Sequence, residues 1–157
     1  MDVNAKQKTI IVPKMEAYYN GNMQGMKIAL WGLAFKPDTD DIREAPALYI
    51  IEELLQRGAE ICAFDPEAMD NVKSRVGDRI SYANDAYEAI DGADCLLIAT
   101  EWSVFRNPDF DRMSKLLLHK VIFDGRNLYE LPHMQQLGYD YFSIGREEVR
   151  SQQPVNS

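Results

Sequence analysis

The sequence is short of basic residues relative to acidic ones, and this shortage limits its possible partners. It carries 17 lysines and arginines against 25 aspartates and glutamates, for a formal net charge of -8. A chain with this charge repels phosphate backbones and anionic lipid surfaces unless its cations are concentrated in one patch. No such patch occurs along the sequence. We therefore exclude a general nucleic-acid binder and a protein that binds anionic membranes.

Cysteines and long apolar runs are also scarce. Cys62 and Cys95 each lie inside a short apolar stretch, "AEICAF" and "ADCLLIAT", so we predict buried thiols rather than a disulfide or a metal pair. No apolar run approaches the roughly 20 residues of a membrane span, and no signal peptide is recognisable at the start. The expectation is a soluble, cytoplasmic protein.

A regular alternation of strand and helix patterns runs through the 157 residues, which are enough for one domain. Short apolar runs that end in a breaker predict buried strands, and amphipathic segments between them predict helices. The predicted strands are 26–32, 59–64, 80–83, 93–100, 120–125 and 139–142, and the predicted helices are 46–57, 67–77, 85–91 and 131–137. This alternation predicts parallel βαβ units with right-handed crossovers.

The fold class is therefore α/β: a three-layer, Rossmann-like sandwich with a mainly parallel sheet, preceded by an N-terminal helix. We expect a helix over residues 1–24, which continues from a region missing upstream, because its apolar residues have no earlier partner. The main domain is expected over residues 25–148. The end of the chain, "SQQPVNS", is polar, and we expect a flexible tail over residues 149–157.

The loop after the first predicted strand lacks the glycines of a dinucleotide site. Gly32 is followed by Leu33, Ala34 and Phe35, which do not fit the G-x-G-x-x-G pattern that lets a backbone approach a pyrophosphate. The sheet alone therefore does not predict independent NAD binding. Asp65, at the end of the second strand, could hold a ribose, but without those glycines a turn-forming Asp-Pro pair is the preferred interpretation.

Three cations follow two separate strands at the edge where parallel sheets bind ligands. Lys36 and Arg43 lie in the long, proline-containing loop "GLAFKPDTDDIREAP", and Arg126 lies in "DGRN". Converging cations suit a phosphate or pyrophosphate, since arginine binds bidentately and lysine acts as a point charge. Solvated ion pairs with the aspartates of the loop explain Lys36 and Arg43 equally well.

The other polar residues near strand ends give no catalytic constellation. In "TEWSVF", Glu101 is interpreted as a hydrogen-bond partner of a neighbouring loop and Trp102 as a cap on the core. His119 and His133 have no carboxylate or serine partner at a recognisable spacing. We predict no catalytic residue and no metal ligands within this chain, which therefore looks like half of a site.

The stretches "GLAFKPDTDDIREAPALYIIEELLQRGAEICAFDPEA", "LLIATEWSVFRN" and "FDGRNLY…GYDYFSIGR" closely resemble the C-terminal UDP-binding domain of the UDP-glucose/GDP-mannose dehydrogenase family, on its UDP-glucose 6-dehydrogenase branch. The resemblance implies a two-step, NAD-dependent oxidation of UDP-glucose to UDP-glucuronate by the full-length enzyme. Neither cysteine matches the family nucleophile, so the fragment alone is expected to be inactive.

The resemblance also implies roles for four residues. Phe35, Lys36 and Arg126 are similar to family contacts with the UDP-sugar, and Arg43 is similar to the arginine that reaches NAD across the domain interface. We expect the acids of the loop to hold Lys36 and Arg43 in position for phosphates. The implied partners are UDP-glucose or UDP-glucuronate, the N-terminal and central domains that bind most of the NAD, and a second subunit in a homodimer or larger assembly.

Two alternatives stay open. The same domain could belong to a related UDP-N-acetylmannosamine or GDP-mannose dehydrogenase, although "KPDTDDIRE" favours the UDP-glucose branch. A non-enzymatic, Rossmann-like interaction module is the second alternative. A nucleotide-binding domain should keep Lys36 and Arg126 accessible at one edge, whereas an interaction module should present a larger apolar patch.

Overall fold

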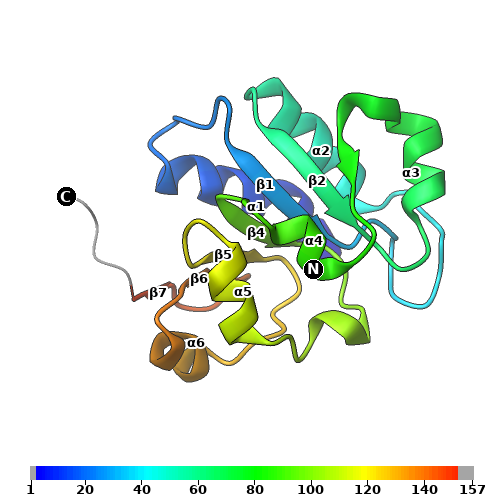
Figure 1. Cartoon of the computed structure of the whole chain (residues 1–157). Helices are drawn as coiled ribbons and strands as arrows, with labels where there is room; N and C mark the ends of the chain where they lie inside the picture. The colour runs from blue at the N-terminus through cyan, green and yellow to red at the C-terminus, as the bar shows by residue number, and fades with distance from the viewer. Residues whose placement is uncertain (1–2, 152–157) are drawn as a thin grey trace.

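A seven-stranded sheet forms the centre of the molecule, with the strand order β3-β2-β1-β4-β5-β6-β7 (Figure 1). The structure is a computed structural model that describes residues 3–151. All neighbouring strands are parallel except β6 and β7, which pair antiparallel. The strands are β1 (Lys27–Trp31), β2 (Glu60–Phe64), β3 (Ser81–Tyr82), β4 (Cys95–Ile98), β5 (Val121–Asp124), β6 (Asp140–Phe142) and β7 (Val149–Arg150).

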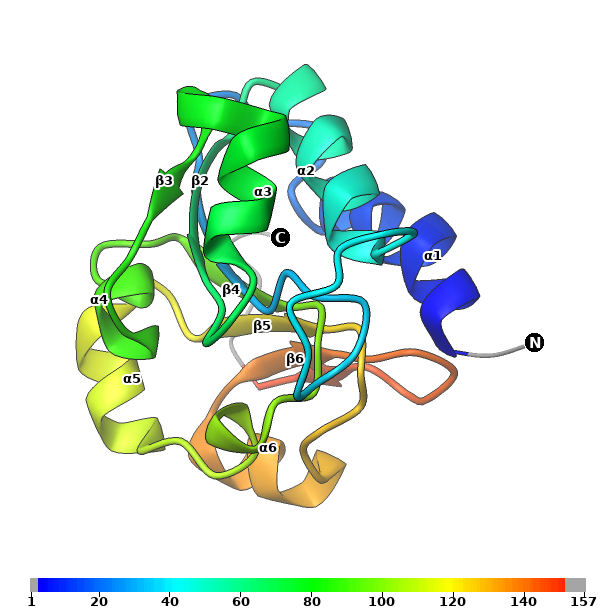
Figure 2. The same ribbon diagram turned by 90° about the vertical axis from the view of Figure 1, so that its right-hand side faces the viewer.

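Helices cover both faces of this sheet, which makes the three-layer sandwich. Figure 2 shows α1 and α2 on one face and α4 and α5 on the opposite face. The helices are α1 (Val3–Tyr18), α2 (Pro46–Gln56), α3 (Met69–Val76), α4 (Ala86–Ile90), α5 (Phe110–Leu116) and α6 (Leu131–Leu137), with short 3₁₀ turns at Gly77–Arg79 and Ser103–Phe105. The predicted α/β class and parallel sheet are confirmed.

The core lies between the helices and the central strands. Strand β1 pairs with β2 on one side and β4 on the other, so that Ile28 lies opposite both Ile61 and Cys95. Every residue of β4 and β5 is buried. Burial on both faces explains why these strands are continuous apolar runs without polar alternation.

Local signals in the sequence fix several helix ends. Pro46 begins α2, where its missing N–H costs nothing, and Gly58 follows the helix with a left-handed φ of +82°. Asp85 caps α4 by accepting hydrogen bonds from the backbone N–H groups of Tyr87 and Glu88. Both helices were predicted at these positions.

Helix α5 and strand β7 depart from the sequence-based expectations. Helix α5 lies in a segment for which no element was predicted. The tail was predicted to begin at residue 149, which is wrong, because Val149 and Arg150 form β7 beside β6. The remainder of that predicted tail, residues 152–157, lies outside the described residues.

Helix α1 ends earlier than the expected helix over residues 1–24. It stops at Tyr18, and Asn20 and Gly21 then adopt left-handed φ values in a turn. The helix is tied to distant parts of the chain: the Tyr18 hydroxyl donates a hydrogen bond to Oδ2 of Asp140 in β6 at 2.6 Å. The first two residues of the predicted helix are outside the described part of the chain.

Both cysteines are free, as predicted, although they differ in exposure. Cys95 in β4 is fully buried, as predicted. The prediction that Cys62 is buried is wrong: it is only half-buried, because every second residue of β2 is incompletely covered. Burial raises the pKa of the Cys95 thiol to about 12 and also raises the pKa of Cys62. Within residues 3–151, no helix is long and apolar enough to cross a membrane.

Candidate functional site at the carboxyl edge of the sheet

The carboxyl ends of the parallel strands meet at one edge, and the loops that form the candidate site leave the sheet there. They follow β1 (residues 32–45), β2 (65–68), β4 (99–109) and β5 (125–130). In Figure 2 the blue-to-cyan loop after β1 crosses the middle of the view. Ligands of open α/β sheets bind outside this edge, in the crevice where the strand order reverses. In this sheet the reversal lies between β1 and β4.

The first loop starts in close contact with the neighbouring strands. Gly32 has a φ of +98°, and its backbone N–H donates to the carbonyl of Phe64 at 2.9 Å. A Cβ at this position would lie only 2.5 Å from the Cβ of Thr100. The Thr100 hydroxyl donates to the carbonyl of Ala34 at 2.8 Å. This part of the loop therefore requires glycine and is held by β2 and by the loop after β4.

A buried carboxylate, Asp65, connects three of the loops. Its Oδ2 accepts hydrogen bonds from the backbone N–H groups of Leu33 at 2.7 Å and Ala34 at 3.1 Å, and from the indole N–H of Trp102 at 3.0 Å. Its Oδ1 accepts from two N–H groups of its own turn, each at 2.8 Å. The predicted turn role of Asp65 is confirmed, but the contacts with the other two loops were not predicted.

The outer part of the first loop forms its own closed turn. The N–H of Phe35 donates to the carbonyl of Asp41 at 2.7 Å and closes the segment between them. Both carboxylate oxygens of Asp41 accept from the guanidinium of Arg43, at 3.0 Å and 2.9 Å. Hydrogen bonding from Arg43 lowers the pKa of Asp41 to about 2. The Arg43 side chain is 85% exposed, so Asp41 orients it without burying it.

Lys36 differs from Arg43, and the expectation that the acids hold both cations is wrong for it. Its side chain is exposed at the turn, and the described residues offer it no hydrogen bond or ion pair. Its effect on Asp41 is only that of a nearby positive charge. Asp40 stabilises the loop through its backbone, since its carbonyl accepts from the side-chain amide of Asn71 at 2.8 Å. Lys36 is therefore an exposed cation on an anchored loop.

Arg126, after β5, is held by acids on two sides. Its Nη2 donates to Oε2 of Glu101 at 2.8 Å, and its backbone N–H donates to Asp124 at 2.8 Å. Asp124 is fully buried and also accepts from the Tyr141 hydroxyl at 2.6 Å and the N–H of Leu128 at 2.7 Å. Burial raises the pKa of Asp124, while these hydrogen bonds act in the opposite direction. The predicted contact of Glu101 with a neighbouring loop is confirmed.

The four predicted site residues thus lie on two loops of the same edge, with different exposures. Lys36 and Arg43 face solvent and Phe35 is half-buried. The expectation that Arg126 stays accessible is wrong, because its side chain is paired with Glu101 and only 13% exposed. Sequence reasoning missed the anchors beneath them, Asp65 and Thr100. The sequence contained a signal for Asp65, because this residue directly follows an apolar strand, and the loops that follow parallel strands lie close together at the carboxyl edge of the sheet.

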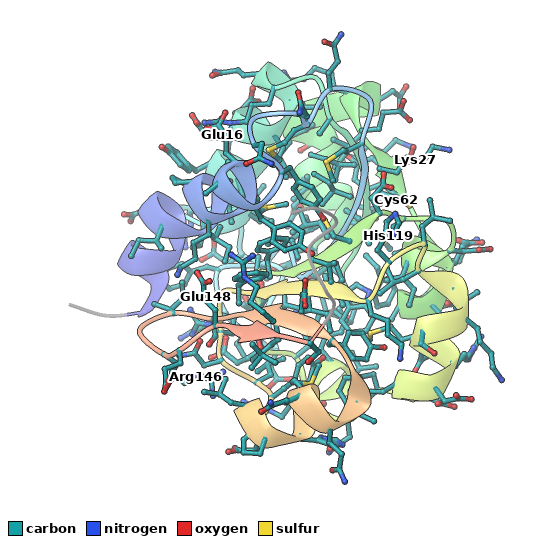
Figure 3. The ribbon with its side chains drawn as sticks, turned by 90° about the vertical axis from the view of Figure 1, so that its left-hand side faces the viewer. Glu16, Lys27, Cys62, His119, Arg146 and Glu148 are labelled. Atoms are coloured by element: carbon teal, nitrogen blue, oxygen red, sulfur yellow. The ribbon has the colours of Figure 1, made fainter. Side chains whose placement is uncertain are left out.

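A cavity on the described part of the molecule lies away from these loops. A cavity of about 210 Å³ at the amino edge is lined by Lys27, Glu60, Cys62, Glu88 and others. Figure 3 looks onto this opposite edge, where Lys27 and Cys62 are labelled. Its mixed charges favour no ligand class. Across residues 3–151, no group of three or more His, Cys, Asp or Glu side chains could hold a metal ion.

A doubly wound α/β domain with cations at its carboxyl edge defines a nucleotide-binding class of protein. Comparison with known proteins makes this more specific. Residues 29–131 match the model of the UDP-glucose/GDP-mannose dehydrogenase family, UDP binding domain. The chain belongs to this family, as its UDP-binding domain.

Relatives and solved structures agree with this assignment. The chain is 42% identical to a UDP-glucose 6-dehydrogenase of Pseudomonas aeruginosa over 91% of its length, and 42% identical to one of Bacillus subtilis over 98%. In each case it spans 33% of the relative's length. A UDP-glucose dehydrogenase structure from Pyrobaculum islandicum is 32% identical, with a TM-score of 0.69 over 80% of this chain and 27% of that chain.

A related structure carries a different sugar specificity in its name. The NDP-N-acetyl-D-galactosaminuronic acid dehydrogenase from Methanosarcina mazei is 25% identical, with a TM-score of 0.76 over 93% of this chain and 30% of that chain. The fold is therefore common to dehydrogenases of different nucleotide sugars. The backbone alone does not select the sugar.

Proposed function

We propose that this chain binds the UDP-sugar substrate of an NAD-dependent UDP-glucose 6-dehydrogenase that converts UDP-glucose to UDP-glucuronate. One observation carries the proposal: the match to the UDP-binding domain covers residues 29–131, which include Phe35, Lys36, Arg43 and Arg126. Relatives at 37–42% identity are named UDP-glucose 6-dehydrogenase, which favours glucose over other sugars.

Each candidate residue has a role that its surroundings support. Lys36 supplies a movable positive charge to the diphosphate, since its ammonium is exposed and has no partner within the described residues. Arg126 supplies a fixed guanidinium that Glu101 orients at 2.8 Å. The half-buried ring of Phe35 packs against the core and offers an apolar surface beside Lys36. These roles concern binding, and the chemistry belongs to residues outside this chain.

NAD, when bound to the full-length enzyme, supplies the hydride acceptor. This chain has no glycine-rich phosphate loop, so it fits only a contributing role toward NAD. Arg43 suits that role, because Asp41 orients its guanidinium and leaves it 85% exposed. We propose that the remaining domains bind most of the cofactor, that the enzyme is a homodimer or larger assembly, and that it acts in the cytoplasm, where two free cysteines are stable.

The interaction-module alternative has less support from the surface. Three large apolar side chains among the described residues are exposed, and they lie on separate segments: Tyr49 in α2, Val104 in the 3₁₀ turn after β4, and Leu118 after α5. A docking surface normally concentrates such residues. The cations at the carboxyl edge are the more distinctive feature.

Calorimetric titration of UDP and UDP-glucose into this chain tests the proposal. Lys36→Ala and Arg126→Ala should each weaken binding by about 10- to 100-fold, which is the effect of losing a charge-assisted contact. The matched control is Arg75→Ala, which removes an exposed cation in the last turn of α3. Binding that is unaffected by either substitution, or equally reduced by the control, would contradict the assigned roles. No binding of UDP by the wild type would contradict the proposal for this chain.

A further inference from the structure

We propose that Asp65 is a positioning residue for the nucleotide site, because its single carboxylate sets the relative placement of the loops that carry Lys36 and Glu101. This inference rests on the proposed function, and it adds a residue that touches none of the expected ligand groups. Asp65 is fully buried at the end of β2. It accepts five hydrogen bonds, with donor distances between 2.7 and 3.1 Å.

The Asp65 carboxylate is buried without a cationic partner among the described side chains. A buried carboxylate is costly unless its lone pairs are satisfied. No ion pair to Asp65 exists among the described side chains, and all five of its donors are neutral N–H groups. A carboxylate accepts on both oxygens, and each oxygen of Asp65 receives N–H donors here. The partners of Asp65 are therefore donors alone, which an acceptor-only side chain satisfies.

The donors outside the turn of Asp65 belong to the loops that follow β1 and β4. Leu33 and Ala34 precede Lys36 by three and two positions, so their hydrogen bonds fix the base of its loop. Trp102 directly follows Glu101, whose carboxylate holds Arg126 at 2.8 Å. One oxygen, Oδ2 of Asp65, therefore joins the loop of Lys36 to the loop that orients Arg126.

An isosteric amide at position 65 cannot accept all five of these hydrogen bonds. Oδ2 accepts three donors and Oδ1 accepts two. Asparagine has one acceptor oxygen, and its NH₂ group would face at least two N–H donors in either orientation. The substitution keeps the volume and breaks at least two of the five hydrogen bonds: either those that join the two loops at Oδ2, or those at Oδ1 that hold residue 65 in its own turn. In both cases Asp65→Asn should disturb the placement of the loops relative to one another while the surrounding core stays packed.

The two tryptophans of this chain provide an internal spectroscopic control. The indole N–H of Trp102 donates to Asp65 at 3.0 Å, whereas that of Trp31 donates to the carbonyl of Ala86 at 2.9 Å. In the ¹H–¹⁵N spectrum, Asp65→Asn should shift the Trp102 indole resonance and the amide resonances of Leu33 and Ala34. The Trp31 indole resonance should stay in place. A general loss of packing would instead move both indole resonances.

The decisive measurement combines this spectrum with UDP titration of wild type, Asp65→Asn and a matched control, Asp70→Asn. Asp70 is an exposed carboxylate in the first turn of α3. We expect Asp65→Asn to raise the dissociation constant of UDP by about tenfold or more, and Asp70→Asn to leave it unchanged. A folded Asp65→Asn protein with wild-type affinity would overturn the inference.

The inference can still be tested if Asp65→Asn does not fold or if the wild type does not bind UDP. If Asp65→Asn does not fold, Trp102→Phe replaces it, since it removes one of the five donors; an unchanged dissociation constant would then overturn the inference. If the wild type does not bind UDP, the proposed function fails by itself. The inference is then decided by the amides of Phe35 and Lys36: shifts in Asp65→Asn support loop positioning, and unshifted resonances overturn it.

Discussion

Replacement of Gly32 by alanine should destabilise the protein by about 2–5 kcal/mol, through two separable causes. The backbone of Gly32 has a φ of +98°, a region that costs an L-residue about 1–2 kcal/mol. The new Cβ would also lie 2.5 Å from the Cβ and 2.6 Å from the backbone N of Thr100. Because backbone at the end of β4 cannot yield easily, overpacking should add about 1–3 kcal/mol.

The matched control for this prediction is Gly145→Ala. Gly145 has a φ of +72°, and a Cβ built there meets no atom within 4 Å. This variant therefore reports the backbone cost alone. Urea unfolding followed by circular dichroism should show a midpoint about 1–2 M lower for Gly32→Ala than for wild type, and a smaller decrease for the control. Equal losses in the two variants would refute the claim that contact with Thr100 requires glycine at this position.

Three other predictions follow from the structure. At pH 8, iodoacetamide should modify Cys62 slowly and leave Cys95 unmodified until the protein unfolds, because burial raises the pKa of Cys95 to about 12. Mass spectrometry in native buffer and in urea would detect this difference between the two cysteines. Equal labelling of both in native buffer would contradict the prediction. Asp85→Ala should cost about 1 kcal/mol of unfolding free energy, since it removes the cap of α4, and wild-type stability would show that the cap contributes nothing. In an NMR titration, the Asp41 carboxyl should have a pKa of about 2, and Arg43→Ala should raise this pKa toward 3.8. Because the pKa of Asp41 is lowered in the folded state, its pairing with Arg43 is complete at neutral pH and is lost only as the pH falls toward 2. An unchanged pKa in that variant would mean that Arg43 does not hold Asp41.

The sequence predicted the central strands well because their environment is uniform. The residues of β4 and β5 are buried on both faces, so an uninterrupted apolar run is the direct consequence. Helix α5 escaped prediction because its single fully buried side chain within the helix is Met113, which gives little periodicity. The two residues of β7 gave no strand signal, since Val149 is buried and Arg150 is exposed and no third residue extends the pattern.

The candidate site was also predictable from the sequence only in part. Topology places loops that follow parallel strands at one edge, so the common location of Lys36, Arg43 and Arg126 could be predicted. The contact between Asp65 and Trp102 joins residues 37 positions apart and depends on the register of separate strands. No local pattern encodes that register. The pairing of Arg43 with Asp41 is local, and its prediction was possible from spacing alone.

The hydrogen bond between Tyr18 and Asp140 has a consequence for how the chain folds during synthesis. The two residues are 122 positions apart, and Asp140 belongs to β6, which leaves a ribosome after strands β1 to β5. Until that strand emerges, the Tyr18 hydroxyl lacks this acceptor, and the edge of β5 that β6 covers lacks its neighbour. Parallel pairing between distant segments is intrinsically slow because loop closure precedes the gain from contacts. The native arrangement of α1 on the sheet is therefore completed only after β6 has been translated.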